Sequence, residues 1–180
     1  MAGTKCESLT LVVGGEALLV ERAVDSVVQR ARKVDPQTER RDLDATEQGV
    51  VGRIDEACSP TLFGGGAVVV IDNVESADES VVAAIVAAAA QASDEVAIVA
   101  LHAGGARGKK LLDKLSQAAG NRVDCVEIKK GRGISDFVSA EVKAAKRSMS
   151  PQAQSILIAA VGSDVRALAS AVSQLANDIE

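Results

Sequence analysis

Aromatic side chains are almost absent from this sequence of 180 residues. Tryptophan and tyrosine do not occur, and two phenylalanines bring the aromatic fraction to only 1%. Proteins that bind single strands of nucleic acid commonly stack the bases on aromatic rings, so this composition leaves little for that mode of binding. The net charge of -5 also argues against a surface devoted to nucleic acid, although it is compatible with a local basic patch.

Cysteine and histidine are also scarce. Cys6, Cys58 and Cys125 are odd in number and widely spaced, which fits neither a disulfide framework nor a zinc site, so we interpret them as packing residues. His102 is the only histidine, and no serine, cysteine or acidic residue is spaced to form a catalytic triad with it. We expect His102 to make hydrogen bonds at the end of a strand, and we predict no catalytic residue, no metal site and no cofactor.

Long apolar runs are missing too. No stretch approaches the roughly 20 residues that a transmembrane helix requires, and the first residues lack the apolar segment of a signal peptide. We therefore expect a cytoplasmic protein without a membrane partner. Hydrophobic residues still make up 47% of the chain, which is enough for a sizeable core in one large domain or in one domain with a small appendage.

Segments typical of strands and helices alternate through the first 130 residues or so. The expected strands are 9–13, 40–44, 67–72, 96–101 and 123–128, with helices at about 19–31, 50–57, 81–92 and 111–118 between them. The runs 67–72 and 96–101 are apolar, as in strands covered on both faces, whereas 40–44 is polar enough to belong near an edge. This alternation predicts a three-layer α/β fold with a largely parallel, five-stranded sheet and right-handed crossovers.

The pattern changes from Gly131 onward, where only helical periodicity remains. Ser150 and Pro151 have the chemistry of a helix N-cap followed by a proline in the first helical position. The apolar residues form three helical stripes: Ile134, Phe137, Val138 and Val142; Ile156, Leu157 and Ala160; Val165, Leu168, Val172, Leu175 and Ile179. We predict a small three-helix domain over residues 132–180, joined to the first domain by a hinge at 129–133.

A short segment before the third predicted strand places Thr61, Leu62 and Phe63 next to three glycines at 64–66. In one interpretation, Leu62 and Phe63 fold beneath the sheet as a hydrophobic plug. In the other, they form an exposed pair that inserts into a pocket on a partner, since buried aromatic residues at the centre of an interface carry much of its binding energy.

The first strand and the turn after it resemble a nucleotide-binding P-loop that has lost its chemistry. In the register that begins at Gly15, Val20 replaces the second glycine, Glu21 replaces the phosphate-binding lysine and Arg22 replaces the magnesium-binding hydroxyl residue. After the third strand, Asp72 occupies the metal-side position of a Walker B motif, but Asn73 replaces the catalytic glutamate and cannot act as a base. We expect no nucleotide triphosphate to bind there.

A second approximate P-loop, residues 103–110, follows the fourth strand. It has alanine in the first position and Lys110 in place of the final serine or threonine. Three interpretations are open for Arg107, Lys109, Lys110 and Lys114: a phosphate-binding loop, a basic edge that contacts a neighbouring subunit or a nucleic-acid backbone, and a solvated surface. A DNA-binding module would use Lys109 and Lys110 together with Lys143, Lys146 and Arg147.

Taken in order, these motifs resemble the delta subunit family of bacterial DNA polymerase III clamp loaders in its actinobacterial form. The resemblance spans essentially the whole chain. It rests on the turn 13–16 without its lysine, the segment 59–63, the loop 104–112 and the helix start at 162–166.

The resemblance implies an AAA+ fold that has lost ATPase activity over residues 1–131 and a three-helix lid over 132–180; the helical collar domain of the family is absent from this sequence. It implies a non-enzymatic subunit that binds and opens the beta sliding clamp during DNA replication as part of the polymerase III holoenzyme. Leu62 and Phe63, beside Thr61, would be the clamp-binding pair, and Arg166 occupies the place of a lid arginine. The implied partners are the clamp, the gamma/tau and delta prime subunits and, weakly or indirectly, DNA. The alternative is a nucleotide- or phosphate-binding protein that uses residues 103–110.

Overall fold

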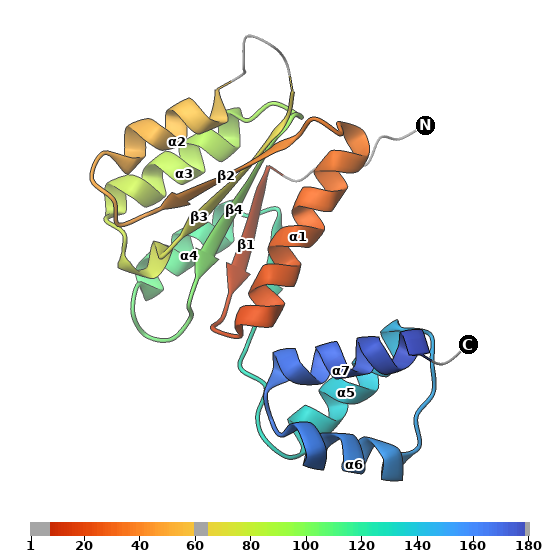
Figure 1. The fold of residues 1–180 in the computed structure, drawn as a ribbon. Coiled ribbons are helices and arrows are strands. Elements are labelled where there is room, and N and C mark those ends of the chain that lie inside the picture. The colour runs from red at the N-terminus through yellow and green to blue at the C-terminus, as the bar shows by residue number, and fades with distance from the viewer. Residues whose placement is uncertain (1–7, 60–64, 179–180) are drawn as a thin grey trace. The chain divides into compact units, whose positions relative to one another are not determined.

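The computed structural model describes residues 8–59 and 65–178. The chain divides after residue 126 into two compact units. The first unit contains a sheet flanked by helices, and the second contains helices alone (Figure 1). Within the described residues, every helix is too short or too polar to cross a membrane.

The first unit is built on five parallel strands. They are β1 (Leu9–Val13), β2 (Glu39–Asp44), β3 (Ala67–Asp72), β4 (Val96–His102) and β5 (Asn121–Asp124). The order in the sheet is β2-β3-β4-β1-β5, and each neighbouring pair is parallel. This confirms the predicted parallel sheet. β2, the most polar of the five, lies at an edge as its composition indicated.

Helices cover both faces of the sheet (Figure 1). They are α1 (Ala17–Val34), α2 (Val50–Cys58), α3 (Glu79–Gln91) and α4 (Lys109–Ala118), with a short 3-10 helix, η1 (Val74–Ser76), after β3. Successive side chains of a strand point to opposite faces. Val68 and Val70 of β3 therefore pack with α1, while Val69 and Ile71 pack with α2 and α3. The result is the predicted three-layer fold.

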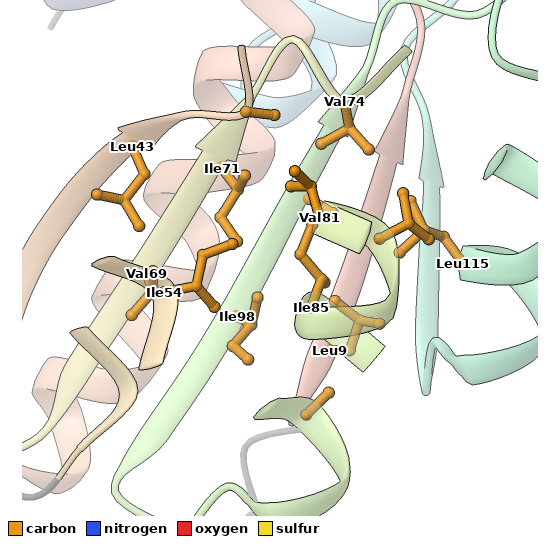
Figure 2. Packing of buried hydrophobic residues seen from close by; sticks show 14 of the residues in the cluster. Leu9, Leu43, Ile54, Val69, Ile71, Val74, Val81, Ile85, Ile98 and Leu115 are labelled. Carbon is orange, nitrogen blue, oxygen red and sulfur yellow. The ribbon is translucent and has the colours of Figure 1, made fainter. Parts of the chain in front are cut away.

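The second of these core layers is shown in Figure 2. Ile54 from α2, Val81 and Ile85 from α3 and Leu115 from α4 join Val69, Ile71 and Ile98 of the sheet. Ile54, Ile71, Ile85, Ile98 and Leu115 are each 0% exposed. Burial of a side chain of this size contributes about 1.5 to 3 kcal/mol, so the layer stabilises the strand ends that carry the candidate sites.

The last strand differs from the prediction. The alternating residues 123–128 predicted a strand over that range. In the structure, β5 begins at Asn121, two residues before the predicted start, and ends at Asp124, four residues before the predicted end. Within the described residues, β5 pairs with β1 alone, from Thr10 opposite Asn121 to Val13 opposite Asp124. Because β1 ends at Val13, the ladder ends there as well.

The second unit contains α5 (Arg132–Ala144), α6 (Pro151–Val161) and α7 (Val165–Asp178). As predicted, Ser150 caps α6: its hydroxyl accepts a hydrogen bond of 3.2 Å from the Ala153 amide, and Pro151 occupies the first turn. Asp164 accepts a 2.8 Å bond from the Ala167 amide at the start of α7.

The core of this unit comes from α5 and α7. The buried residues are Ile134, Phe137, Val138 and Val142 of α5 and Val165, Leu168, Ala169 and Val172 of α7. The predicted stripe on α6 is not a buried stripe, because no residue of that helix is buried and Ile156 is 63% exposed. α6 is apolar around much of its circumference, so its composition does not select one inward face.

Candidate functional site

The candidate residues that the structure describes lie mainly around the carboxyl edge of the sheet. All strands run in the same direction, so the turns after β1, β3 and β4 meet at the carboxyl edge, where α/β proteins usually bind ligands. Segment 60–64 joins α2 to β3 and therefore leads into the amino edge. A strand of six residues such as β3 separates the two edges by about 20 Å.

At the carboxyl edge, the turn between β1 and α1 is tied to strands on both sides. The Gly14 amide donates to the carbonyl of His102 at the end of β4 (2.9 Å), and the Glu16 amide donates to the carbonyl of Cys125 just after β5 (3.0 Å). A P-loop presents its amides to phosphate instead. In this turn, the Gly14 and Glu16 amides instead donate to carbonyl groups of the protein itself.

The turn after β3 is held in a similar way. Asn73, in the place of a catalytic glutamate, has a positive φ of 57° and donates from its side-chain amide to a carboxylate oxygen of Asp44 at 2.9 Å. Asp44 also accepts bonds from the hydroxyl (2.6 Å) and amide (2.8 Å) of Thr46. These bonds, first the Thr46 hydroxyl and then its amide, with a smaller contribution from Asn73, lower the pKa of Asp44. Asn73 therefore links the ends of β2 and β3.

The loop from β4 to α4 is organised around His102. This side chain is 1% exposed, and its Nδ1 accepts a hydrogen bond of 2.9 Å from the Gly104 amide. The proton of the neutral ring is therefore assigned to Nε2, which lies 3.4 Å from the Gly108 carbonyl. The Ala103 amide donates to Glu75 at 3.1 Å. The expected strand-end role of His102 is confirmed, and two amides of the approximate P-loop are bonded internally.

The basic residues predicted near this loop lie close together in the chain and are exposed. Arg107 belongs to the loop, while Lys109 and Lys110 form the first turn of α4. Positive charges near a helix N-terminus interact unfavourably with the helix dipole. Lys109 and Lys110 are therefore not explained by a contribution to the stability of α4. Lys114, one turn further, lies 3.5 Å from Glu79 of α3.

The cations of the alternative DNA-binding module belong to both units. Lys143 lies in the last turn of α5, and Lys146 follows the helix with a positive φ of 56°. Arg147 donates through Nη2 to the carbonyl of Ala176 at 3.0 Å, near the end of α7. That contact gives Arg147 a structural role in holding α7. Arg166, the residue in the place of a lid arginine, is exposed in the first turn of α7.

The predicted clamp-binding residues Thr61, Leu62 and Phe63 lie outside the described residues. Two side chains from the stretch 35–41 form hydrogen bonds with the chain on either side of them. On one side, Arg41 of β2 donates to the carbonyl of Ala57 near the end of α2 at 2.9 Å. On the other, Asp35 accepts a 2.8 Å bond from the Gly66 amide.

Two residues that hold these chain ends, Asp35 and Arg41, are not indicated by the sequence pattern. Asp35 lies between the first predicted helix and the second predicted strand, and Arg41 lies in the polar run 40–44. Their partners lie 31 and 16 residues away in the chain. No local spacing signals such contacts, which depend on how β2 and α2 pack.

A cavity of about 540 Å³ opens beside β2 and α2. It is lined by Arg41, Asp42, Leu43, Arg53, Glu56, Ala57 and Ser59. Its two arginines already have partners: Arg41 pairs with Glu39 at 3.0 Å, and Arg53 pairs with Glu47. Among residues 8–59 and 65–178, no cluster of histidine, cysteine or carboxylate side chains could hold a metal ion.

Neither a family model nor a curated protein matches this sequence. Solved structures do. The Bacillus subtilis DNA clamp loader delta protein (YqeN) matches with a TM-score of 0.73 over 96% of this chain and 53% of its own, at 18% identity. The Thermotoga maritima RuvB Holliday junction branch migration motor matches with a TM-score of 0.56 over 92% of this chain and 53% of its own, at 12% identity.

This chain therefore shares its α/β fold with the clamp loader delta protein and with RuvB. It spans about half the length of the structures that it matches. The similarity to the clamp loader delta protein extends over both units, because the match covers 96% of the chain. Because the two sequences are only 18% identical, this match is evidence for a shared fold and does not by itself show a shared function.

Proposed function

We propose that this protein is a clamp-loader delta subunit that binds and opens the beta sliding clamp during DNA replication, without ATPase activity of its own. The observation that carries the proposal is the match to a clamp loader delta protein, with a TM-score of 0.73 over 96% of the chain. The sequence motifs that resemble this family point independently to the same function. Residues 1–131 would be the degenerate AAA+ domain, and 132–180 the lid.

The carboxyl edge supports the absence of ATPase activity. The Gly14 and Glu16 amides are bonded to neighbouring strands, and Asn73 is bonded to Asp44 where a catalytic base would be required. Glu21 carries a negative charge in the place of the phosphate-binding lysine. In the proposed mechanism, ATP bound by other loader subunits determines when the clamp-binding segment becomes accessible.

The proposed clamp contact is mechanical. Leu62 and Phe63, with Thr61 beside them, would enter an apolar pocket of the clamp, and burial of each large side chain would contribute about 1.5 to 3 kcal/mol. The segment leads into β3, a strand buried along its first five residues, and such a rigid support limits the ordering cost of binding. Arg107, Lys109 and Lys110 are proposed to face the gamma/tau or delta prime subunits or DNA.

The test is calorimetric titration of the sliding clamp from the same organism with the wild-type chain and with Leu62→Ala/Phe63→Ala. We expect the wild type to bind and the double variant to lose at least tenfold in affinity, which corresponds to about 1.4 kcal/mol. Val34→Ala is a matched control, since Val34 is an apolar residue of the same unit that is 74% exposed. It should bind as the wild type does. A wild-type chain that does not bind the clamp would contradict the proposal.

A further inference from the structure

We propose that Asp35 and Arg41 are positioning residues for clamp binding, because they hold the two chain ends between which segment 60–64 runs. This inference rests on the proposed function. It concerns described residues only: Asp35, Thr38 and Arg41 on one side, and Ala57 and Gly66 on the other.

The end that leads into β3 is held by a carboxylate. Asp35 accepts a 2.8 Å bond from the Gly66 amide through one oxygen and a 2.9 Å bond from the Gln37 amide through the other. The Gly66 carbonyl in turn accepts a 3.0 Å bond from the Glu39 amide. Both backbone groups of Gly66 are therefore bonded to the stretch 35–39. The Gly66 bond, and then the Gln37 bond, lower the pKa of Asp35, so it is ionised at neutral pH.

The backbone at Gly66 is also closely packed. A Cβ added at Gly66 would lie 2.7 Å from the carbonyl oxygen of Glu95 and 3.0 Å from the hydroxyl of Thr38. Thr38 is itself 4% exposed, and its hydroxyl donates to the carbonyl of Asp35 at 2.7 Å. The backbone at Gly66 is thus enclosed by Asp35, Thr38 and Glu95.

The end that follows α2 is held by a cation. Arg41 donates through Nη1 to the carbonyl of Ala57 at 2.9 Å, and a positive charge is favourable at the C-terminus of a helix. Its Nη2 pairs with Glu39 at 3.0 Å, which fixes the guanidinium in place. Ser59 then closes the helix with a 2.7 Å bond from its hydroxyl to the carbonyl of Asp55.

These contacts give both ends a common support. Asp35 directly follows α1 and Arg41 belongs to β2, and each bonds to a backbone group rather than to a side chain. A segment whose two ends are fixed loses less conformational entropy when it binds, so its affinity is higher. The strand that carries Arg41, β2, also pairs in parallel with β3, the strand that follows Gly66.

The experiment measures clamp affinity for Asp35→Ala, Asp35→Asn, Arg41→Ala and the double alanine variant, each under conditions where its urea unfolding curve shows a folded protein. We expect each alanine variant to weaken clamp binding about fivefold, the order of a hydrogen bond to a charged group that is partly replaced by water. Asp35→Asn, which keeps one oxygen acceptor, should recover part of the loss.

Two neighbouring charges serve as matched controls. Arg40→Ala removes an exposed arginine of β2 that pairs with Asp42 at 2.7 Å, and Asp25→Ala removes an exposed carboxylate of α1 that lies 3.9 Å from Arg40. Within the part of the chain that the structure describes, the side chains of Arg40 and Asp25 bond to neither Gly66 nor Ala57, and both variants should bind the clamp as the wild type does.

Hydrogen exchange at the Gly66 amide separates positioning from general stability. In Asp35→Ala this amide should exchange about tenfold faster, while amides of β4 in the centre of the sheet keep their wild-type rates. Wild-type clamp affinity in the Asp35→Ala and Arg41→Ala variants would overturn the inference and leave the proposed function intact. A wild-type chain that does not bind the clamp would instead refute the proposed function and, with it, the positioning role.

Discussion

Gly14 shows how a single residue can allow two backbone segments to approach each other closely. Its φ is +138°, and a Cβ at this position would lie 2.0 Å from the carbonyl oxygen of Cys125. That carbonyl is already held by the Glu16 amide at 3.0 Å. The strand β1, its turn and the chain after β5 are therefore in direct backbone contact, and only glycine fits between them.

Gly14→Ala should accordingly reduce the free energy of unfolding by about 2 to 4 kcal/mol, through the disfavoured backbone conformation and the displacement of the Cys125 carbonyl. Gly15→Ala is the matched control, because nothing lies within 4 Å of a Cβ at that position. Urea denaturation of the two variants and the wild type provides the measurement. Equal midpoints for both variants would show that the turn adapts freely.

At the scale of elements, the two loops that resemble P-loops share one property. The turn after β1 bonds its Gly14 and Glu16 amides to neighbouring strands, and the loop after β4 bonds its Ala103 and Gly104 amides to Glu75 and His102. Phosphate binding requires such amides to be directed at the ligand. In each loop, two backbone amides are therefore already bonded within the protein and are not directed at a ligand.

We therefore expect millimolar Mg-ATP to leave the thermal unfolding midpoint of this protein unchanged. A ligand present at 100 times its Kd would stabilise the fold by about 2.7 kcal/mol, which is readily detected. Differential scanning fluorimetry with and without Mg-ATP is sufficient. A rise in the midpoint that disappears in Lys109→Ala/Lys110→Ala would favour the alternative function, phosphate binding by residues 103–110.

For the whole molecule, two carboxylates make the free energy of unfolding depend on pH. Hydrogen bonds lower the pKa of Asp35, chiefly from the Gly66 amide, and of Asp44, chiefly from the Thr46 hydroxyl. A lowered pKa in the folded state means that the carboxylate stabilises the fold above its unfolded pKa. This stabilisation is lost as the pH falls through the folded pKa.

Urea midpoints should therefore be steady near neutral pH and fall below about pH 4, where unfolded aspartates begin to bind protons. Asp44→Asn removes one of the two groups, so its midpoint should fall by less between pH 7 and pH 3 than that of the wild type. Asp35→Asn should behave in the same way. An unchanged pH dependence in both variants would mean that these bonds do not contribute to acid sensitivity.

Local pattern was sufficient for most of the elements. The apolar run 67–72 is β3 itself, the polar run 40–44 lies in an edge strand, and Ser150 caps α6. Each of these features depends on residues that are neighbours in the chain. The errors came where a neighbour was distant: β5 ends where β1 ends, and α6 is left without a buried residue.

The sequence by itself determined the strands, the helices and their caps, since periodicity, capping and turn chemistry act over a few residues. It also contained the motifs that resemble clamp-loader delta subunits. Only the tertiary structure decided which side chains hold the edges of the sheet. Asp35 meets Gly66 across 31 residues, and Asp44 meets Asn73 across 29. Such pairs form because the order of strands in the sheet brings together residues that are distant in the chain. That order cannot be read from the spacing of residues along the sequence.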